Sequence, residues 1–185
     1  MAMRQACSFH GKQAGVTLIE QIMVVAVLGV LAAIAAPSLA RLLRRNQVQL
    51  AQAEFIAALQ HARGTAAVSG KSTLLCPSRD GVRCSGETRW ESGWLIGHDV
   101  ARKGQPDAAP LRTGPGHAGI TILGDSGRRL VRFQSDGSAS GTTNTLRFCR
   151  RGQPGQTLLV VISNSGRVRG AEASADQAAS CAAAQ

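Results

Sequence analysis

The sequence predicts an α+β protein in which a long N-terminal helix, membrane-spanning in its first half, packs on a small antiparallel β-rich head domain. Three observations predict this fold: an apolar run over residues 16–36, a helical apolar stripe that continues it, and short strand patterns after residue 71. A chain of 185 residues leaves room for one such head. We divide it into a leader (1–15), an apolar helix (16–40), an amphipathic continuation (41–70) and a β-rich head with a disulfide-anchored C-terminal tail (71–185).

The N-terminal apolar run is long enough to cross a membrane. Residues 16–36 comprise 21 positions, and a helix needs about 20 residues to cross the hydrocarbon core. A short leader that contains Arg4 and Lys12 ends at Gly15, directly before the run. An ordinary signal peptide has its cleavage site after the apolar region, so this order indicates a different kind of export signal.

Glu20 places a carboxylate at the fifth position of the apolar run. A charge at membrane depth costs at least about 2.5–3.5 kcal/mol, so an ionisable residue there is by default functional and has a partner. The alternative is a single-pass anchor that contains an incidental glutamate.

The segment G-V-T-L-I-E at residues 15–20 resembles the class III signal of type IV pilins and type II secretion pseudopilins. The resemblance implies that prepilin peptidase cuts between Gly15 and Val16 and that Val16 is then N-methylated. It implies that Glu20 pairs with the N-terminal amine of a neighbouring subunit. Pro37, at mature position 22, matches a helix-kinking proline of many pilins. The expected location is the inner membrane, with a single span in contact with lipid and a periplasmic head, in a pilus or pseudopilus.

After Pro37 the helix is predicted to continue to about Ser69. Apolar residues recur there at steps of three and four positions, which gives one apolar stripe on an otherwise polar segment. The stripe consists of Val48, Ala51, Phe55, Leu59, Ala62 and Ala66. We expect it to pack against the sheet of the head and the helix to end at Ser69-Gly70.

The segment after residue 71 has the pattern of short strands separated by turn residues. The predicted strands are 72–76, 94–98, 120–123, 130–134, 145–149, 158–163 and 167–169. Turn signals lie at 134–138 and 163–166. We expect the Gly- and Pro-rich residues 100–118 to form a mobile loop, and the tail, 171–185, to be disordered without Cys181 to anchor it.

Removal of the leader, with Cys7, leaves four cysteines, an even number that favours disulfides in an exported domain. Cys76, Cys84, Cys149 and Cys181 allow three connectivities. We favour Cys76 with Cys84, which closes a short turn, and Cys149 with Cys181, which ties the tail to a strand. Zinc is the competing interpretation, but the sequence has no C-x-x-C pair and no well-spaced histidine.

Four short blocks mark the head: L-C-P-S at 75–78, G-W-L-I at 93–96, D-G at 136–137 and G-R-V-R at 166–169. Together they resemble the GspH/FimT family of minor pilins and pseudopilins. In the FimT branch, the G-R-x-R element resembles a DNA-binding motif of minor pilins used in natural transformation. The GspH branch serves type II secretion. The resemblance implies other pilin or pseudopilin subunits as partners.

The part of the chain outside the membrane is strongly basic. From Arg41 onward it has 19 Lys or Arg residues and 10 Asp or Glu residues, and such a surface attracts polyanions. Nearly all the cations are arginines, whose planar fork suits phosphate. The alternative is a generic basic surface.

The segment Gly166-Arg167-Val168-Arg169 is predicted to contact DNA. The two arginines are two positions apart, hence on one face of a strand and about 6.6 Å apart, so they can contact neighbouring phosphates. Gly166 is expected to allow close backbone approach. The patch is predicted to extend over a preceding strand and turn to Arg147, Arg150 and Arg151. The alternative is a pair of solvated arginines on an edge strand.

The sequence predicts no enzyme, no cofactor and no metal site. His98 and Asp99 are adjacent, so on a strand they point to opposite faces and do not form a base and its orienting carboxylate. No paired carboxylates, phosphate loop or metal-ligand spacing occurs.

The predicted function is that of a minor type IV pilin that binds extracellular double-stranded DNA non-specifically for uptake during natural transformation. The chain has no Tyr and few other aromatic residues, which argues against base stacking and for contacts with phosphate. The alternatives are a GspH-like pseudopilin of the type II secretion system and a structural minor pilin that primes pilus assembly.

Overall fold

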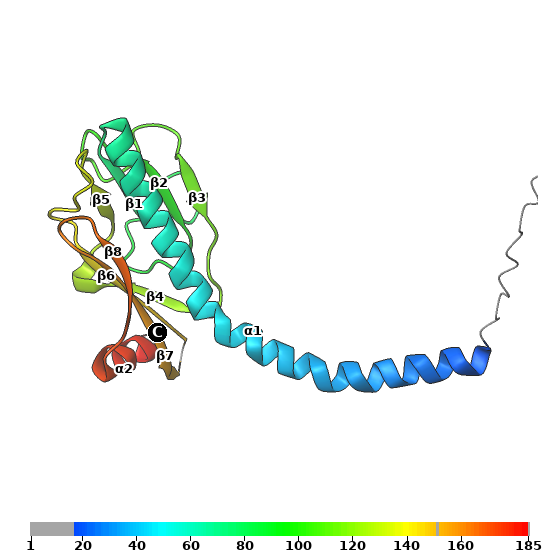
Figure 1. Ribbon diagram of the computed structural model, residues 1–185. Coiled ribbons are helices and arrows are strands. Elements are labelled where there is room, and N and C mark those ends of the chain that lie inside the picture. The colour runs from blue at the N-terminus through cyan, green and yellow to red at the C-terminus, as the bar shows by residue number, and fades with distance from the viewer. Residues whose placement is uncertain (1–16, 151, 185) are drawn as a thin grey trace, which may run out of the picture. The chain divides into compact units, whose positions relative to one another are not determined.

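The computed structural model describes residues 17–150 and 152–184, which form one long helix, two antiparallel sheets and a short C-terminal helix (Figure 1). The chain separates into two compact units, with the boundary between Leu43 and Arg44. The predicted α+β architecture, a long N-terminal helix followed by an antiparallel β-rich head, is confirmed.

Helix α1 (Leu18–Ser69) begins in the apolar run. Its first part, Leu18–Ala36, has a mean hydropathy of 2.4 over 19 residues, and none of it is buried. By length and composition this part can cross a membrane. The helix continues through Pro37 and ends before Gly70, whose φ of +66° lies in the left-handed region that glycine adopts readily. The predicted end at Ser69 is confirmed.

The second part of α1 buries an apolar stripe in the core of the head. The residues of the stripe are all at most 2% exposed: Val48, Ala51, Phe55, Ala58, Leu59, Ala62 and Ala66. The ring centroid of Phe55 lies 5.2 Å from that of Phe148 and 6.3 Å from those of Trp90 and Trp94. Burying a side chain of this size contributes about 1.5–3 kcal/mol. The predicted stripe therefore holds the helix to the sheets.

The first sheet, which we call sheet A, has the strand order β3-β2-β1-β5, and all its pairs are antiparallel. Its strands are β1 (Thr73–Pro77), β2 (Trp94–His98), β3 (Arg112–Gly114) and β5 (Val131–Phe133). Strands β1, β2 and β5 confirm predicted strands. Strand β3 lies inside the segment that was expected to be a loop, because this strand is set by pairing with β2 and has no apolar alternation of its own.

The second sheet, sheet B, has the strand order β4-β6-β7-β8 and is also antiparallel. Its strands are β4 (Thr121–Gly124), β6 (Asn144–Arg150), β7 (Gln153–Ile162) and β8 (Val168–Glu172), and the 3-10 turn η1 (Asp125–Gly127) follows β4. Leu146 and Phe148 of β6 and Val160 and Ile162 of β7 point into the core. All four strands were predicted, although β7 is longer than expected.

The C-terminal tail forms helix α2 (Ala175–Ala183), which the sequence analysis missed. Ser174 Oγ accepts a hydrogen bond from Gln177 N, and the Gln177 side chain accepts one from Ser174 N, so the two residues form a capping box at the start of the helix. The alanines that follow are strong helix formers.

Two disulfides bind the head together, with the connectivity that the sequence favoured. Cys76 is joined to Cys84 and Cys149 to Cys181, with Cα–Cα distances of 5.6 and 6.1 Å. The second bridge attaches α2 to β6. Cross-links of this kind contribute about 2–4 kcal/mol, chiefly by restricting the unfolded chain.

Candidate nucleic-acid interface

The β7–β8 hairpin carries the two arginines that the sequence singled out. In its turn, Gly166 N donates to Ser163 O at 2.9 Å, and Ser163 N donates to Arg167 O at 3.1 Å. Gly166 has a φ of +74°, and a left-handed glycine at this place is typical of a three-residue hairpin loop. The turn fixes the register in which Val168 pairs with Ile162.

Arg167 and Arg169 lie on the outer face of sheet B. Val168 packs against the core, and a Cβ added to Gly170 would lie 3.1 Å from Gln52 Nε2 of α1. Because side chains alternate along a strand, Arg169 points to the opposite face. Arg167 directly precedes β8, where its carbonyl oxygen accepts from Ser163 N. Both arginines are exposed, and neither guanidinium has a hydrogen bond or ion pair with any residue that the structure describes. Two free cations, whose backbones are about 6.6 Å apart at the spacing of a strand, therefore face solvent at this hairpin.

Gly166 is buried, which corrects the expectation that it lets a ligand approach the backbone. A Cβ at this position would stand 1.9 Å from Gly137 O and 3.3 Å from Arg63 Nε. The glycine thus allows the turn between β5 and β6 (residues 134–138) to lie close to the backbone of the hairpin. Gly166 therefore shapes the hairpin and is covered by this turn.

Arg147 is covered by α2, which corrects the expectation that it widens the exposed patch. It lies on the same face as Arg169, two strands away, and its side chain is 22% exposed. Its Nη1 donates to Ser180 Oγ at 3.3 Å, and its Nη2 is 3.8 Å from Asp125 Oδ1. Helix α2, which was not predicted, therefore covers the Arg147 guanidinium and accepts one of its hydrogen bonds.

Arg150 lies at the other end of β7 from the hairpin. It pairs with Gln153, the first residue of β7, whereas the turn of the hairpin follows Ile162, the last residue of β7. Nine strand steps separate the two ends, or about 30 Å. Arg150 therefore does not extend the patch of Arg167 and Arg169. Arg151 lies outside the described residues.

The N-terminal site residues can be placed in part. Glu20 lies in the first turn of α1 and its side chain is exposed, within the apolar segment. Gly15 and Val16 lie outside the described residues.

The adjacent titratable residues His98 and Asp99 each have a different hydrogen-bond partner within the head. His98 Nδ1 lies 3.1 Å from Thr73 Oγ1, whereas the adjacent Asp99 carboxylate accepts from Arg132 Nε at 2.9 Å. Over residues 17–150 and 152–184, no group of three or more His, Cys, Asp or Glu side chains could hold a metal ion.

An apolar N-terminal helix that continues into a head of two antiparallel sheets is the type IV pilin-like fold. This fold defines the chain as a minor pilin or pseudopilin, a class of membrane-anchored subunits that associate with other pilin subunits. The chain belongs to the GspH family, described as type II transport protein GspH, which it matches over residues 51–166. Members of this family are structural subunits. No curated protein matches the chain in sequence.

Solved structures of minor pilins and pseudopilins are similar to this one. The type IV minor pilin FimU of Pseudomonas aeruginosa is 26% identical, with a TM-score of 0.59 over 69% of this chain and 90% of its own. A second crystal form of FimU gives 26% identity and a TM-score of 0.56 over 67% and 92% of the two chains. The minor pseudopilin EpsH of the Vibrio cholerae type 2 secretion system is 17% identical, with a TM-score of 0.48 over 68% and 96%.

Proposed function

We propose that this chain is a minor type IV pilin whose head binds extracellular double-stranded DNA, without sequence preference, for uptake during natural transformation. The observation that carries the proposal is the pair of exposed guanidinia of Arg167 and Arg169, which have no partner among the described residues. Arginine binds phosphate through a planar fork of N–H donors. The spacing of the two side chains suits neighbouring phosphates of one strand.

The rest of the head supports contacts with phosphate rather than with bases. From Arg41 onward, the chain has 19 basic and 10 acidic residues, and this excess of positive charge attracts a polyanion from a distance. All the described aromatic side chains are buried: Phe55, Trp90, Trp94, Phe133 and Phe148. None of them offers a stacking platform for an unpaired base. Binding should therefore be weak for a single head, at about 10⁻⁴ to 10⁻⁶ M, and should depend on salt.

The likeness to the minor pilin FimU supports a type IV pilus over a secretion pseudopilus. The second candidate function, that of a pseudopilin of the type II secretion system, is supported by the description of the matched family. A structural minor pilin that primes assembly is the third. Deleting the gene separates the first two, because it should abolish DNA uptake in one case and protein export in the other.

We further propose that prepilin peptidase cuts the chain between Gly15 and Val16 in the inner membrane, and that Glu20 pairs with the new N-terminal amine of a neighbouring subunit. The exposed Glu20 side chain in an otherwise apolar segment motivates this proposal. Mass spectrometry of the mature protein should find a methylated Val16. An intact N-terminus would contradict the proposal.

DNA binding is tested on the full chain in non-ionic detergent micelles, by fluorescence anisotropy with labelled duplexes of two unrelated sequences. Replacing both Arg167 and Arg169 by Gln should weaken binding of both duplexes equally and flatten the slope of log K against log salt by up to about 1.8. The matched control is Arg83→Gln with Arg112→Gln, two exposed arginines whose side chains also have no partner in the described residues.

The control pair should keep most of the affinity and the original slope. If the Arg167 and Arg169 pair also keeps them, or if the wild-type protein does not bind duplex, the proposed function is wrong. In cells, the same double variant should assemble pili normally and take up DNA poorly.

A further inference from the structure

The turn between β5 and β6 lies directly against the β7–β8 hairpin. Within the turn, Gly137 N donates to Gln134 O at 2.8 Å. Just after the turn, Ala139 N donates to Asn164 O of the hairpin at 2.9 Å, which joins the two segments. Gly137 O also occupies the space beside Gly166. The turn and the hairpin therefore form one surface at this end of the head.

Arg63 of α1 reaches this surface. Its Nε donates to Gly137 O at 3.1 Å and lies 3.3 Å from the position that a Cβ on Gly166 would take. The side chain is exposed, and its two Nη groups have no partner among the described residues. One N–H thus fixes the guanidinium against the turn, and the others remain available to a ligand.

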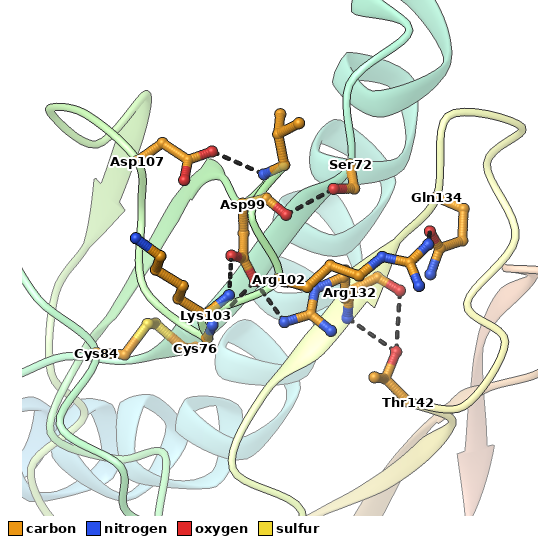
Figure 2. A network of polar contacts seen from close by, with 12 residues as sticks. Ser72, Cys76, Cys84, Asp99, Arg102, Lys103, Asp107, Arg132, Gln134 and Thr142 are labelled. Carbon is orange, nitrogen blue, oxygen red and sulfur yellow. Dashed lines mark hydrogen bonds and ion pairs between the residues drawn. A yellow bond between two sulfur atoms is a disulfide. The ribbon is translucent and has the colours of Figure 1, made fainter.

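Arg102 reaches the same turn from the loop between β2 and β3. Its Nη2 donates to Gln134 Oε1 at 3.0 Å, and its side chain is exposed (Figure 2). Its φ is +55°, and no other non-glycine residue that the structure describes has a positive φ. Such a backbone is strained by about 1–3 kcal/mol and persists only when its surroundings hold it.

The buried carboxylate of Asp99 holds the strained loop (Figure 2). Asp99 accepts from Lys103 N at 2.7 Å, from Gly104 N at 3.1 Å and from Arg132 Nε at 2.9 Å. The first two bonds fix the backbone directly after Arg102, and Arg102 N itself donates to the carbonyl oxygen of Asp99 at 3.3 Å. The strain therefore serves to place Arg102 beside Gln134.

From this arrangement we propose that Arg63 and Arg102 form a second half of the DNA-binding surface, and that each contacts a phosphate of the duplex held by Arg167 and Arg169. This inference rests on the proposed function. Because α1 packs on the opposite face of β8 from the two hairpin arginines, Arg63 flanks the hairpin on the other side. A surface that is basic on both sides of the hairpin suits a duplex, which offers two phosphate backbones.

The number of phosphate contacts determines how strongly binding depends on salt. With four contacts, the slope of log K against log salt is about −3.6, and the affinity falls about 150-fold between 50 and 200 mM salt. With two contacts, the same change in salt lowers the affinity about 12-fold. The ratio of the affinities at the two salt concentrations therefore shows whether Arg63 and Arg102 contact phosphate, and absolute affinities are not needed.

The test uses the full chain in detergent micelles and a labelled duplex. Arg63→Gln with Arg102→Gln should reduce the salt response from about 150-fold to about 12-fold. The pair Arg63→Lys with Arg102→Lys keeps both charges and should keep a response near that of the wild type. Arg83→Gln with Arg112→Gln is again the control of equal charge, and unfolding curves of all variants verify that the head is folded.

Each outcome is decisive. If the Gln pair matches the control pair while Arg167→Gln with Arg169→Gln still flattens the salt response, this inference is wrong and the proposed function stands. If the Lys pair loses as much as the Gln pair, the arginines position the turn and do not bind phosphate. If the wild-type protein does not bind duplex, both proposals are overturned.

Discussion

Three arginines around sheet A have carboxylate partners, whereas the arginines at the β7–β8 hairpin have none among the described residues. In the first region the pairs are Arg79 with Glu87, Arg89 with Glu91 and Arg132 with Asp99. In the second region Arg63 and Arg102 donate to neutral oxygens, and the guanidinia of Arg167 and Arg169 have no partner that the structure describes.

The difference separates structural arginines from those that are available to a ligand. In the first region, a carboxylate within the chain balances each of these three charges, and Glu87 raises the pKa of Arg79 further by accepting its hydrogen bond. In the second region, the charge remains unbalanced, so an anion from outside the chain can supply the missing partner. The net charge of +10 does not by itself make this distinction, because it counts both kinds of arginine alike.

The comparison predicts its largest effect for Arg132. The Asp99 side chain is fully buried, and that of Arg132 is 14% exposed. Arg132→Gln leaves a buried charge without its ionic partner, which should lower the free energy of unfolding by about 3–5 kcal/mol. Urea unfolding, followed by the fluorescence of the buried Trp90 and Trp94, measures the loss.

Two further variants complete this test. Combining Arg132→Gln with Asp99→Asn should recover part of the lost stability, because no charge then remains buried. Arg112→Gln, at an exposed and unpartnered position, should change it by less than about 0.5 kcal/mol. A similarly small loss for Arg132→Gln would contradict the division into two classes of arginine.

A smaller effect is expected for the Arg89–Glu91 pair. Arg89 Nε lies 2.7 Å from Glu91 Oε1, and the two side chains are 31% and 22% exposed. Partly exposed ion pairs contribute about 0.2–1 kcal/mol. Arg89→Gln should therefore lower the free energy of unfolding by no more than about 1 kcal/mol in the same urea experiment. It should leave the salt dependence of DNA binding unchanged, since a change there would place Arg89 among the ligand-binding arginines.

The smallest effect concerns Asp136, the one acidic residue of the β5–β6 turn. Ser138 N donates to its carboxylate at 2.8 Å and lowers the pKa of that carboxyl, so it is ionised at neutral pH. Asp136→Asn keeps an acceptor for Ser138 and removes a negative charge beside the proposed phosphate sites. DNA affinity at 50 mM salt should rise, by up to about twofold for a charge about 10 Å away in water.

Asp176→Asn on α2 is the matched control for Asp136, since it removes an exposed carboxylate that follows the end of β8 opposite the hairpin turn. It should leave the affinity unchanged. An equal rise for the two variants would mean that DNA responds to net charge and not to the surface at the hairpin.

Local pattern predicted most of the secondary structure. The apolar stripe from Val48 to Ala66 has the period of a helix and is buried as one face of α1. The seven predicted strands all occur in chain order. The two missed elements had weaker signals. Strand β3 is three residues long and is held by its neighbour. Helix α2 had only the capping box of Ser174 and Gln177 as a signal, in a tail that was predicted to be anchored by Cys181 but not to be helical.

The sequence by itself determined the long helix, the two disulfides, the hairpin and the exposure of Arg167 and Arg169. These follow from local periodicity, turn chemistry and an even cysteine count, which act over short stretches of chain. Only the tertiary structure decided which other arginines lie beside the hairpin. Arg147 and Arg150 are near it in the sequence, but one is covered by α2 and the other lies about 30 Å away along β7. Arg63 and Arg102 are distant in sequence and meet at one turn, because the packing of α1 and the buried Asp99 carboxylate bring them there.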